Sequence, residues 1–300
     1  MTAEKTAHSN THSNTHEGAR SSAHSTTRTS TCEARISAAA HEGARSSVLA
    51  LTLSYEGTCY HGFARQPSTL TVQGELELAL QVLLRREVLT VCAGRTDAGV
   101  HGLGQVVSFE VAEQELEGRS LEKLQRSLNA LTPADIVVRR LEQKPAGFSA
   151  RFNAVEREYR YRIVTGSVPP VFLAKYAWWL PLQVPLDVTA MREAALLLLG
   201  EHDFSSFCVK ESIKGKSPVR TLTMLHLFGA DHLGEHCTVV QVCGNAFLQS
   251  MVRVIVGSLV EVGLRNKPPE WIGEVLAAHD RSRAGQTAPP QGLTLWEVRY

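Results

Sequence analysis

The sequence has few of the features that mark membrane, secreted or zinc-binding proteins. No apolar run approaches the roughly 20 residues of a membrane-spanning helix, and the N-terminus lacks the basic and then apolar order of a signal peptide. The six cysteines show no C-x-x-C spacing, which disfavours both a zinc site and a set of disulfides. We therefore expect free thiols in a soluble protein of the reducing cytoplasm.

The chain also lacks an excess of charge of either sign. Its 31 Lys and Arg residues are balanced by 30 Asp and Glu residues, so the formal net charge is +1. A nucleic acid would have to be bound by a local cluster of basic side chains rather than by the charge of the whole chain. At 300 residues with 43% apolar composition, the chain is long enough to bury one large or two medium cores.

The first 46 residues differ in composition from the rest. They are mainly Ser, Thr, Ala and His, and the run HEGARSS occurs at 16–22 and again at 41–47. Such a segment has too little apolar surface to offset its ordering entropy, so we predict a disordered tail over 1–46. Its five histidines follow no ligand geometry, so no metal site is expected. A transit peptide is an alternative that the four glutamates of this segment disfavour.

From residue 47 onward, apolar periodicity predicts mixed strands and helices. Together they predict an α+β fold of two similar halves, 47–170 and 171–300, with antiparallel-rich mixed sheets flanked by helices and an active-site cleft between the halves. The expected strands are 48–55, 89–93, 104–111, 135–141, 158–163, 219–228, 236–243 and 293–299, and the expected helices are 74–86, 120–131, 187–199, 246–263 and 269–278.

A glycine-rich loop between two predicted strands carries the most informative residues. It reads GRTDAGVHG at 94–102 and holds one acid, Asp97, with one arginine and one histidine. Its glycines indicate a tight turn or a close approach to a ligand, but no Gly-Lys-Ser/Thr ending supports a phosphate-binding loop. From these residues alone, a hairpin loop in which Asp97 bonds its own backbone remains an open alternative. We expect His101 to tie the loop to its surroundings rather than to act as an acid or base.

This loop and the segments that follow resemble one family, in order, over about 47–300. The run at 94–102 closely resembles the signature of the bacterial TruA-type tRNA pseudouridine synthases. The sequence departs from that family's usual pattern at Phe63, where Trp is more common, and at Gln249 and Ser250, where two His are frequent. The other similar segments are SYEGTCYHGF (54–63), ARFNA (150–154), REYRY (157–161), GEHDFSSF (200–207) and NAFLQSMVR (245–253).

The resemblance implies an isomerase that converts uridine to pseudouridine in the tRNA anticodon stem-loop, as a homodimer and without a cofactor. It assigns Asp97 as the nucleophile, and a carboxylate suits a reaction in which a covalent bond forms and is later released. It further implies that Arg95 fills the gap left by the flipped-out base and that Tyr159 stacks on the uracil. Alternatives are the same reaction on a different RNA, or a non-catalytic tRNA-binding protein, which would gain little from an acid facing a polyanion.

Arg253 lies in a predicted helix that is apolar on nearly all sides. Such a helix should be largely buried, so the guanidinium must reach either water or an anion. On the sequence alone, an arginine that bonds backbone carbonyls or extends to the surface is an equal alternative. The resemblance favours a catalytic role, because the family places an arginine against its catalytic aspartate. We therefore predict an ion pair between Arg253 and Asp97.

Basic residues also gather around the predicted strand at 158–163. They could line a surface that contacts RNA phosphates, although runs of charge are usually no more than solvated faces. The members of this group are Arg139, Arg140, Arg151, Arg157, Arg160 and Arg162.

Overall fold

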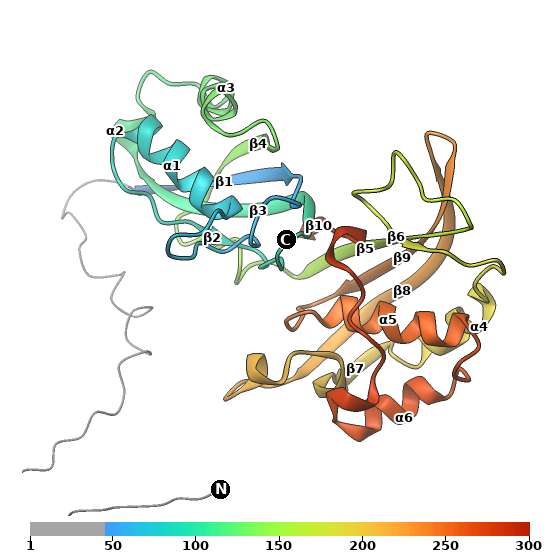
Figure 1. Cartoon of the computed structure of the whole chain (residues 1–300). Helices are drawn as coiled ribbons and strands as arrows, with labels where there is room; N and C mark the ends of the chain where they lie inside the picture. The colour runs from blue at the N-terminus through green and yellow to red at the C-terminus, as the bar shows by residue number, and fades with distance from the viewer. Residues whose placement is uncertain (1–45) are drawn as a thin grey trace, which may run out of the picture. The chain divides into compact units, whose positions relative to one another are not determined.

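The computed structural model describes residues 46–300, and one ten-stranded sheet forms their centre (Figure 1). The pairs β3–β10 and β5–β6 are parallel, whereas the remaining neighbours are antiparallel, so the predicted α+β class with a mixed, antiparallel-rich sheet is confirmed. The strand order is β4 (Ile136–Lys144), β1 (Ser46–Tyr55), β3 (His101–Ala112), β10 (Leu293–Arg299), β5 (Glu156–Thr165), β9 (Glu235–Gly244), β8 (Val219–His232) and β7 (Gly200–Asp203), with β2 (Val91–Cys92) beside β3 and β6 (Trp178–Leu180) beside β5.

Six α-helices flank this sheet within the described residues, and short 3₁₀ turns occur at Ser205–Phe207, Lys210–Ile213, Arg281–Arg283 and Pro290–Gly292. Helices α1 and α3 share one apolar core with β1, β3 and β4, and helices α4, α5 and α6 share another with β5, β8 and β9 (Figure 1). The helices are α1 (Val72–Leu84), α2 (Glu113–Leu116), α3 (Leu121–Leu131), α4 (Val188–Leu196), α5 (Met251–Gly263) and α6 (Trp271–Ala278).

The last strand, β10, connects the strands of the two cores. Its Thr294 pairs in parallel with His101 of β3, and the same strand runs antiparallel to β5. β5 in turn pairs with β9, so the sheet continues from the first core into the second. The division of the fold at residue 170 stays a prediction.

Most predicted elements occur close to their predicted positions, with instructive exceptions. Helix α5 begins at Met251 rather than at residue 246, because Ser250 has φ 60° and lies in the left-handed region, where a helix cannot continue. β6, β7 and α2 were not predicted, since elements of three or four residues show no recognisable period. The tail predicted over 1–46, with its histidines, lies outside the described residues except for Ser46, which begins β1.

Within residues 46–300, no helix is long and apolar enough to cross a membrane. In the same range, no group of three or more His, Cys, Asp or Glu side chains could hold a metal ion. The five cysteines there, Cys59, Cys92, Cys208, Cys237 and Cys243, are free thiols.

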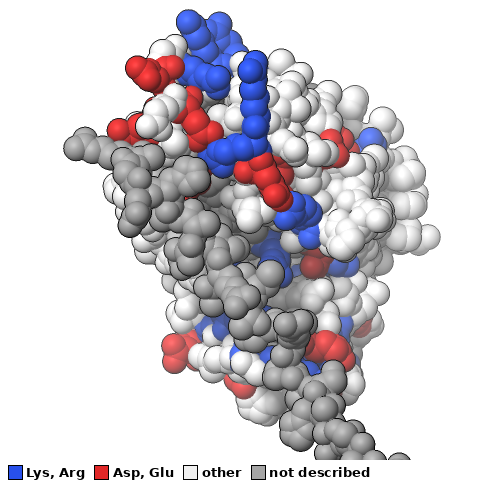
Figure 2. All heavy atoms as spheres, turned by 90° about the vertical axis from the view of Figure 1, so that its left-hand side faces the viewer, with Lys and Arg blue, Asp and Glu red and all other residues white. Residues whose placement is uncertain are grey.

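Charged side chains of both signs are mixed on the face of the molecule shown in Figure 2. Lys and Arg lie among Asp and Glu in the part of this face that is not drawn in grey. This mixing is consistent with the formal net charge of +1. An RNA-binding site on this face would therefore be a local cluster of basic residues rather than the whole face.

Candidate active site

The loop between β2 and β3 is fixed by backbone hydrogen bonds to the segment that follows β1. The Phe63 N–H donates to the Thr96 carbonyl at 3.0 Å, and the Gly99 N–H donates to the Tyr60 carbonyl at 3.2 Å. Gly62 has φ 101°, and a Cβ there would lie 2.8 Å from the Thr96 carbonyl oxygen. This close approach requires glycine, and it holds the loop backbone in a fixed position.

Asp97 lies on this loop and meets the second part of the chain at the start of α5. Its Oδ2 accepts hydrogen bonds from Ser250 Oγ at 2.8 Å and from Arg253 Nη1 at 3.3 Å. The predicted Arg253–Asp97 ion pair is therefore confirmed. The Asp97 side chain is 26% exposed and that of Arg253 is 16% exposed, so solvent can still reach the carboxylate.

The first turn of α5 presents Arg253 in a defined orientation. Arg253 Nε donates to the Ala288 carbonyl at 2.7 Å, and the Ala288 N–H donates back to the Arg253 carbonyl at 3.1 Å. The guanidinium thus combines a carbonyl and a carboxylate, which were alternatives in the sequence analysis. The N-terminal end of a helix also carries partial positive charge, which favours an anion such as Asp97 beside it.

Tyr159 of β5 lies next to the start of the same loop. It is 6% exposed, and its ring packs edge-on against Phe247 with centroids 5.0 Å apart. A Cβ on Gly94 would come within 3.4 Å of the Tyr159 hydroxyl oxygen. Burial raises the pKa of Tyr159 above its ordinary value, so the phenol keeps its proton at neutral pH.

Arg157 connects the three chain segments around this site. All five of its N–H groups donate to backbone carbonyls, and burial of the guanidinium lowers its pKa from the ordinary value. Arg157 is 8% exposed and faces the same side of β5 as Tyr159, so its assignment to a basic surface was wrong. The bonds run from Nε to Ala93 at 3.3 Å, from Nη1 to Ala154 at 2.9 Å and Asn245 at 2.6 Å, and from Nη2 to Ala93 at 3.0 Å and Arg151 at 2.8 Å.

Arg95, on this loop, and Arg151 are both exposed. Burial raises the pKa of the Cys92 thiol, and the positive charges of Arg95 and Arg151 both act against that rise. Arg95 itself lies two positions before Asp97 on the loop.

His101 ties this loop to three other segments, as expected. Its Nδ1 accepts the Gly57 N–H at 3.0 Å, and its Nε2 lies 2.9 Å from the Lys175 carbonyl and 3.2 Å from the Gln291 carbonyl. These partners require a neutral ring with the proton on Nε2. Burial lowers the pKa of His101, although Glu56, 3.4 Å from Nδ1, acts in the opposite direction.

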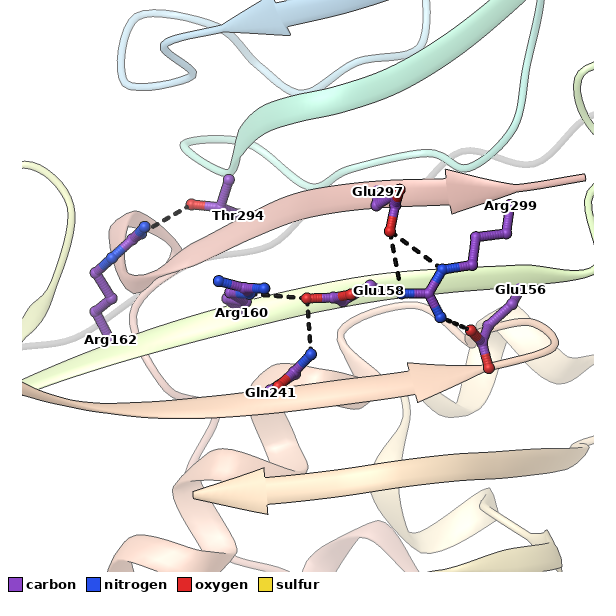
Figure 3. A network of polar contacts seen from close by, with 8 residues as sticks. All are labelled: Glu156, Glu158, Arg160, Arg162, Gln241, Thr294, Glu297 and Arg299. Carbon is purple, nitrogen blue, oxygen red and sulfur yellow. Dashed lines mark hydrogen bonds and ion pairs between the residues drawn. The ribbon is translucent and has the colours of Figure 1, made fainter. Parts of the chain in front are cut away.

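The opposite face of β5 carries a network of charged side chains (Figure 3). Arg160 donates to Glu158 at 2.8 Å and lies over the Trp296 ring at 3.9 Å, and Arg162 donates to Thr294 at 3.3 Å. The grouped arginines therefore do not share one surface. Whether the outward-facing ones contact RNA stays a prediction.

Two residues of this site, Ser250 and Arg157, were not predicted from the sequence. Ser250 was noted for departing from the family pattern, but no role was assigned to it. Its position directly before the true start of α5 was the available signal, and the misplaced helix start concealed it. Arg157 was grouped with Arg160, although the two-residue period of a strand places Arg157 on the side of Tyr159 instead.

Comparisons with known proteins agree with these features. A family model described as tRNA pseudouridine synthase matches residues 52–153 and 194–300, which include Asp97 and Arg253. The chain is 44% identical over 254 residues to tRNA pseudouridine synthase A of Brevibacillus brevis, covering 84% of this chain and 99% of that protein. It is 40% identical over 252 residues to the protein of the same name from Thermotoga neapolitana, covering 84% and 99%, and 42% identical over 251 residues to that of a Geobacillus species, covering 83% and 96%.

Proposed function

Since the chain belongs to the tRNA pseudouridine synthase family, we propose that it converts uridine to pseudouridine in the anticodon stem-loop of tRNA, with Asp97 as the nucleophile. The observation that supports this role most directly is the setting of the Asp97 carboxylate. It is partly exposed, its loop backbone is fixed, and its Oδ2 is held by Ser250 and Arg253. A carboxylate that served only to bond its own loop would not need these two partners from a distant segment.

The reaction is an isomerisation that needs no change of oxidation state. The bond between uracil N1 and ribose C1′ breaks, a bond between C5 and C1′ forms, and C5 loses the proton that N1 gains. A carboxylate can form a temporary covalent bond to the substrate and leave again when the new bond is complete. Arg253 offsets the negative charge of Asp97 and fixes its direction, so the nucleophile does not reorganise during the reaction.

Two further residues would handle the flipped base. Extrusion of a base from a stem costs a few kcal/mol, and an exposed guanidinium on the catalytic loop suits Arg95 to occupy the space that the base leaves. Tyr159 would contact the extruded uracil, because its hydroxyl lies next to Gly94 at the start of that loop. Homodimeric assembly is proposed from the family resemblance.

The test is to map pseudouridine in tRNA from cells with and without this gene, and in tRNA transcripts treated with the purified protein. We expect positions in the anticodon stem-loop to lose pseudouridine without the gene and to gain it from the protein in vitro. A loss at positions outside that arm would contradict the proposed substrate region. An unchanged pseudouridine map, together with inactive purified protein, would contradict the reaction itself.

A further inference from the structure

Ser250 adopts a backbone conformation that is unfavourable for serine. Its φ and ψ are 60° and 8°, in the left-handed region that glycine adopts freely and other residues rarely use. The loop that precedes Ser250 is held at both of its ends, because Arg157 Nη1 donates to the Asn245 carbonyl at 2.6 Å and the Val209 N–H donates to the Gln249 carbonyl at 3.3 Å. A non-glycine residue kept in this region next to a functional group suggests that its side chain has a use.

The Ser250 hydroxyl does not serve the helix that follows it. Serine before a helix commonly accepts a hydrogen bond from the first turn and thereby stabilises the helix N-terminus. Here Ser250 is the N-cap residue of α5, but its side chain makes no capping hydrogen bond. Its Oγ instead donates to Asp97 Oδ2 at 2.8 Å, across 153 positions of sequence.

The two oxygens of Asp97 are consequently in different situations. Ser250 Oγ and Arg253 Nη1 both bind Oδ2. Among the side chains of residues 46–300, these two supply the hydrogen bonds that Asp97 receives, and neither of them goes to Oδ1. Two donors on one oxygen fix the rotation of the carboxylate about its Cβ–Cγ bond and leave the other oxygen available.

We propose that Ser250 is a positioning residue of the reaction, which holds Asp97 through Oδ2 so that Oδ1 is the oxygen that attacks the substrate. This inference rests on the proposed role of Asp97 as nucleophile. Ser250 fixes the orientation of the Asp97 carboxylate, whereas Arg253 fixes its orientation and also offsets its negative charge. The hydroxyl is therefore required for the rate of the chemical step and not for the binding of tRNA.

Three substitutions separate this role from a structural one. Ser250→Gly removes the hydroxyl and suits the left-handed backbone, so its thermal midpoint should equal or exceed that of the wild type. Ser250→Ala removes the hydroxyl without relieving the backbone. Ser250→Asn keeps a donor and tolerates the left-handed region, which makes it the conservative variant. Each is measured for single-turnover pseudouridine formation, for the Kd of tRNA and for the thermal midpoint.

We expect the single-turnover rate constant to fall by about ten-fold in Ser250→Gly and Ser250→Ala, because one hydrogen bond to a charged group is lost. Ser250→Asn should recover most of that loss, and the Kd of tRNA should be unchanged in all three. A glycine variant as fast as the wild type, or an asparagine variant as slow as alanine, would overturn the role of Ser250. Neither result would affect the proposed reaction, which is contradicted instead by an unchanged pseudouridine map together with inactive wild-type protein.

Discussion

The two faces of β5 use arginine in opposite ways. On the inner face, which is the face toward α5, Arg157 is buried and donates all five of its N–H groups to backbone carbonyls. On the opposite, outer face, Arg160 is 27% exposed. It forms an ion pair with Glu158 and also lies over the Trp296 ring (Figure 3). The first arrangement fixes the backbone of the segments around Asp97, whereas the second joins side chains that have other partners.

The two faces differ in the hydrogen bonds that the acceptor groups keep when one arginine is removed. Glu158 on the outer face also accepts from Gln241 at 2.9 Å and from Arg299 at 3.1 Å, so the loss of Arg160 leaves it bonded. On the inner face, the loss of Arg157 takes a donor from four carbonyls at once. Several buried carbonyls left without a donor cost more than the loss of one of three donors to a carboxylate that stays bonded. Arginines of one strand should therefore differ widely in their importance.

The largest effect on catalysis should come from Arg253 of α5, which packs toward the inner side of the sheet and contacts the proposed nucleophile. Arg253→Ala should lower the single-turnover rate of pseudouridine formation by about 10²-fold, since a preorganised donor to the reacting group is lost. Arg253→Lys should restore activity only in part, because one ammonium cannot bind the Ala288 carbonyl and Asp97 with the same geometry. Full activity of the alanine variant would contradict the proposed role of the ion pair.

Arg157→Met should affect stability most. The substitution keeps the length and apolar packing of the side chain but removes every donor, so we expect the free energy of unfolding to fall by about 2 to 4 kcal/mol. Chemical denaturation monitored by circular dichroism measures this change. A loss below that of the matched outer-face variant, Arg160→Met, would show that the carbonyl contacts do not hold the site together.

His101 also hydrogen-bonds backbone carbonyls, as Arg157 does. Unlike an arginine, it can gain or lose a proton in the accessible pH range. Its pKa is lowered by burial, so the unfolded chain binds this proton more readily than the folded protein does. The stability it contributes should be complete above the unfolded pKa of about 6.5 and should be lost as the pH falls below that value. The free energies of unfolding of the wild type and of His101→Gln, measured by denaturation at pH values from 7.5 to 5.5, should therefore converge as the pH falls. Parallel curves would rule out this linkage.

Arg160→Met should have the smallest effect. Because Glu158 keeps two other partners, the free energy of unfolding should fall by less than about 1 kcal/mol. Its single-turnover rate should equal that of the wild type. If its Kd for tRNA rises while stability is kept, the outer face contacts RNA, and the two faces differ in function as well as in construction.

The parts of the structure that follow from local patterns were accessible from the sequence. Apolar periodicity predicted most strands and helices, and the apolar surroundings of Arg253 together with the family resemblance predicted its ion pair with Asp97. The pairing of β10 between β3 and β5 was not accessible, because it joins strands far apart along the chain. No local pattern reports such a pairing.

The contacts that position the site were also hidden from the sequence. Arg157 binds backbone carbonyls, which every residue carries, so no complementary side chain indicates its partners. Ser250 depends on a left-handed backbone conformation that its own residue type disfavours. The conformational preference of a residue type thus fails to predict the structure at positions where tertiary contacts around the site impose another conformation.

The most direct test of the account is single-turnover pseudouridine formation by purified Asp97→Asn, with tRNA binding measured on the same preparation. Asparagine keeps the size of the side chain and its acceptor oxygen but lacks the nucleophilic carboxylate. The account predicts no product above the enzyme-free background and a Kd for tRNA within a few-fold of the wild type. Substantial pseudouridine from this variant would contradict the assignment of Asp97 as the nucleophile.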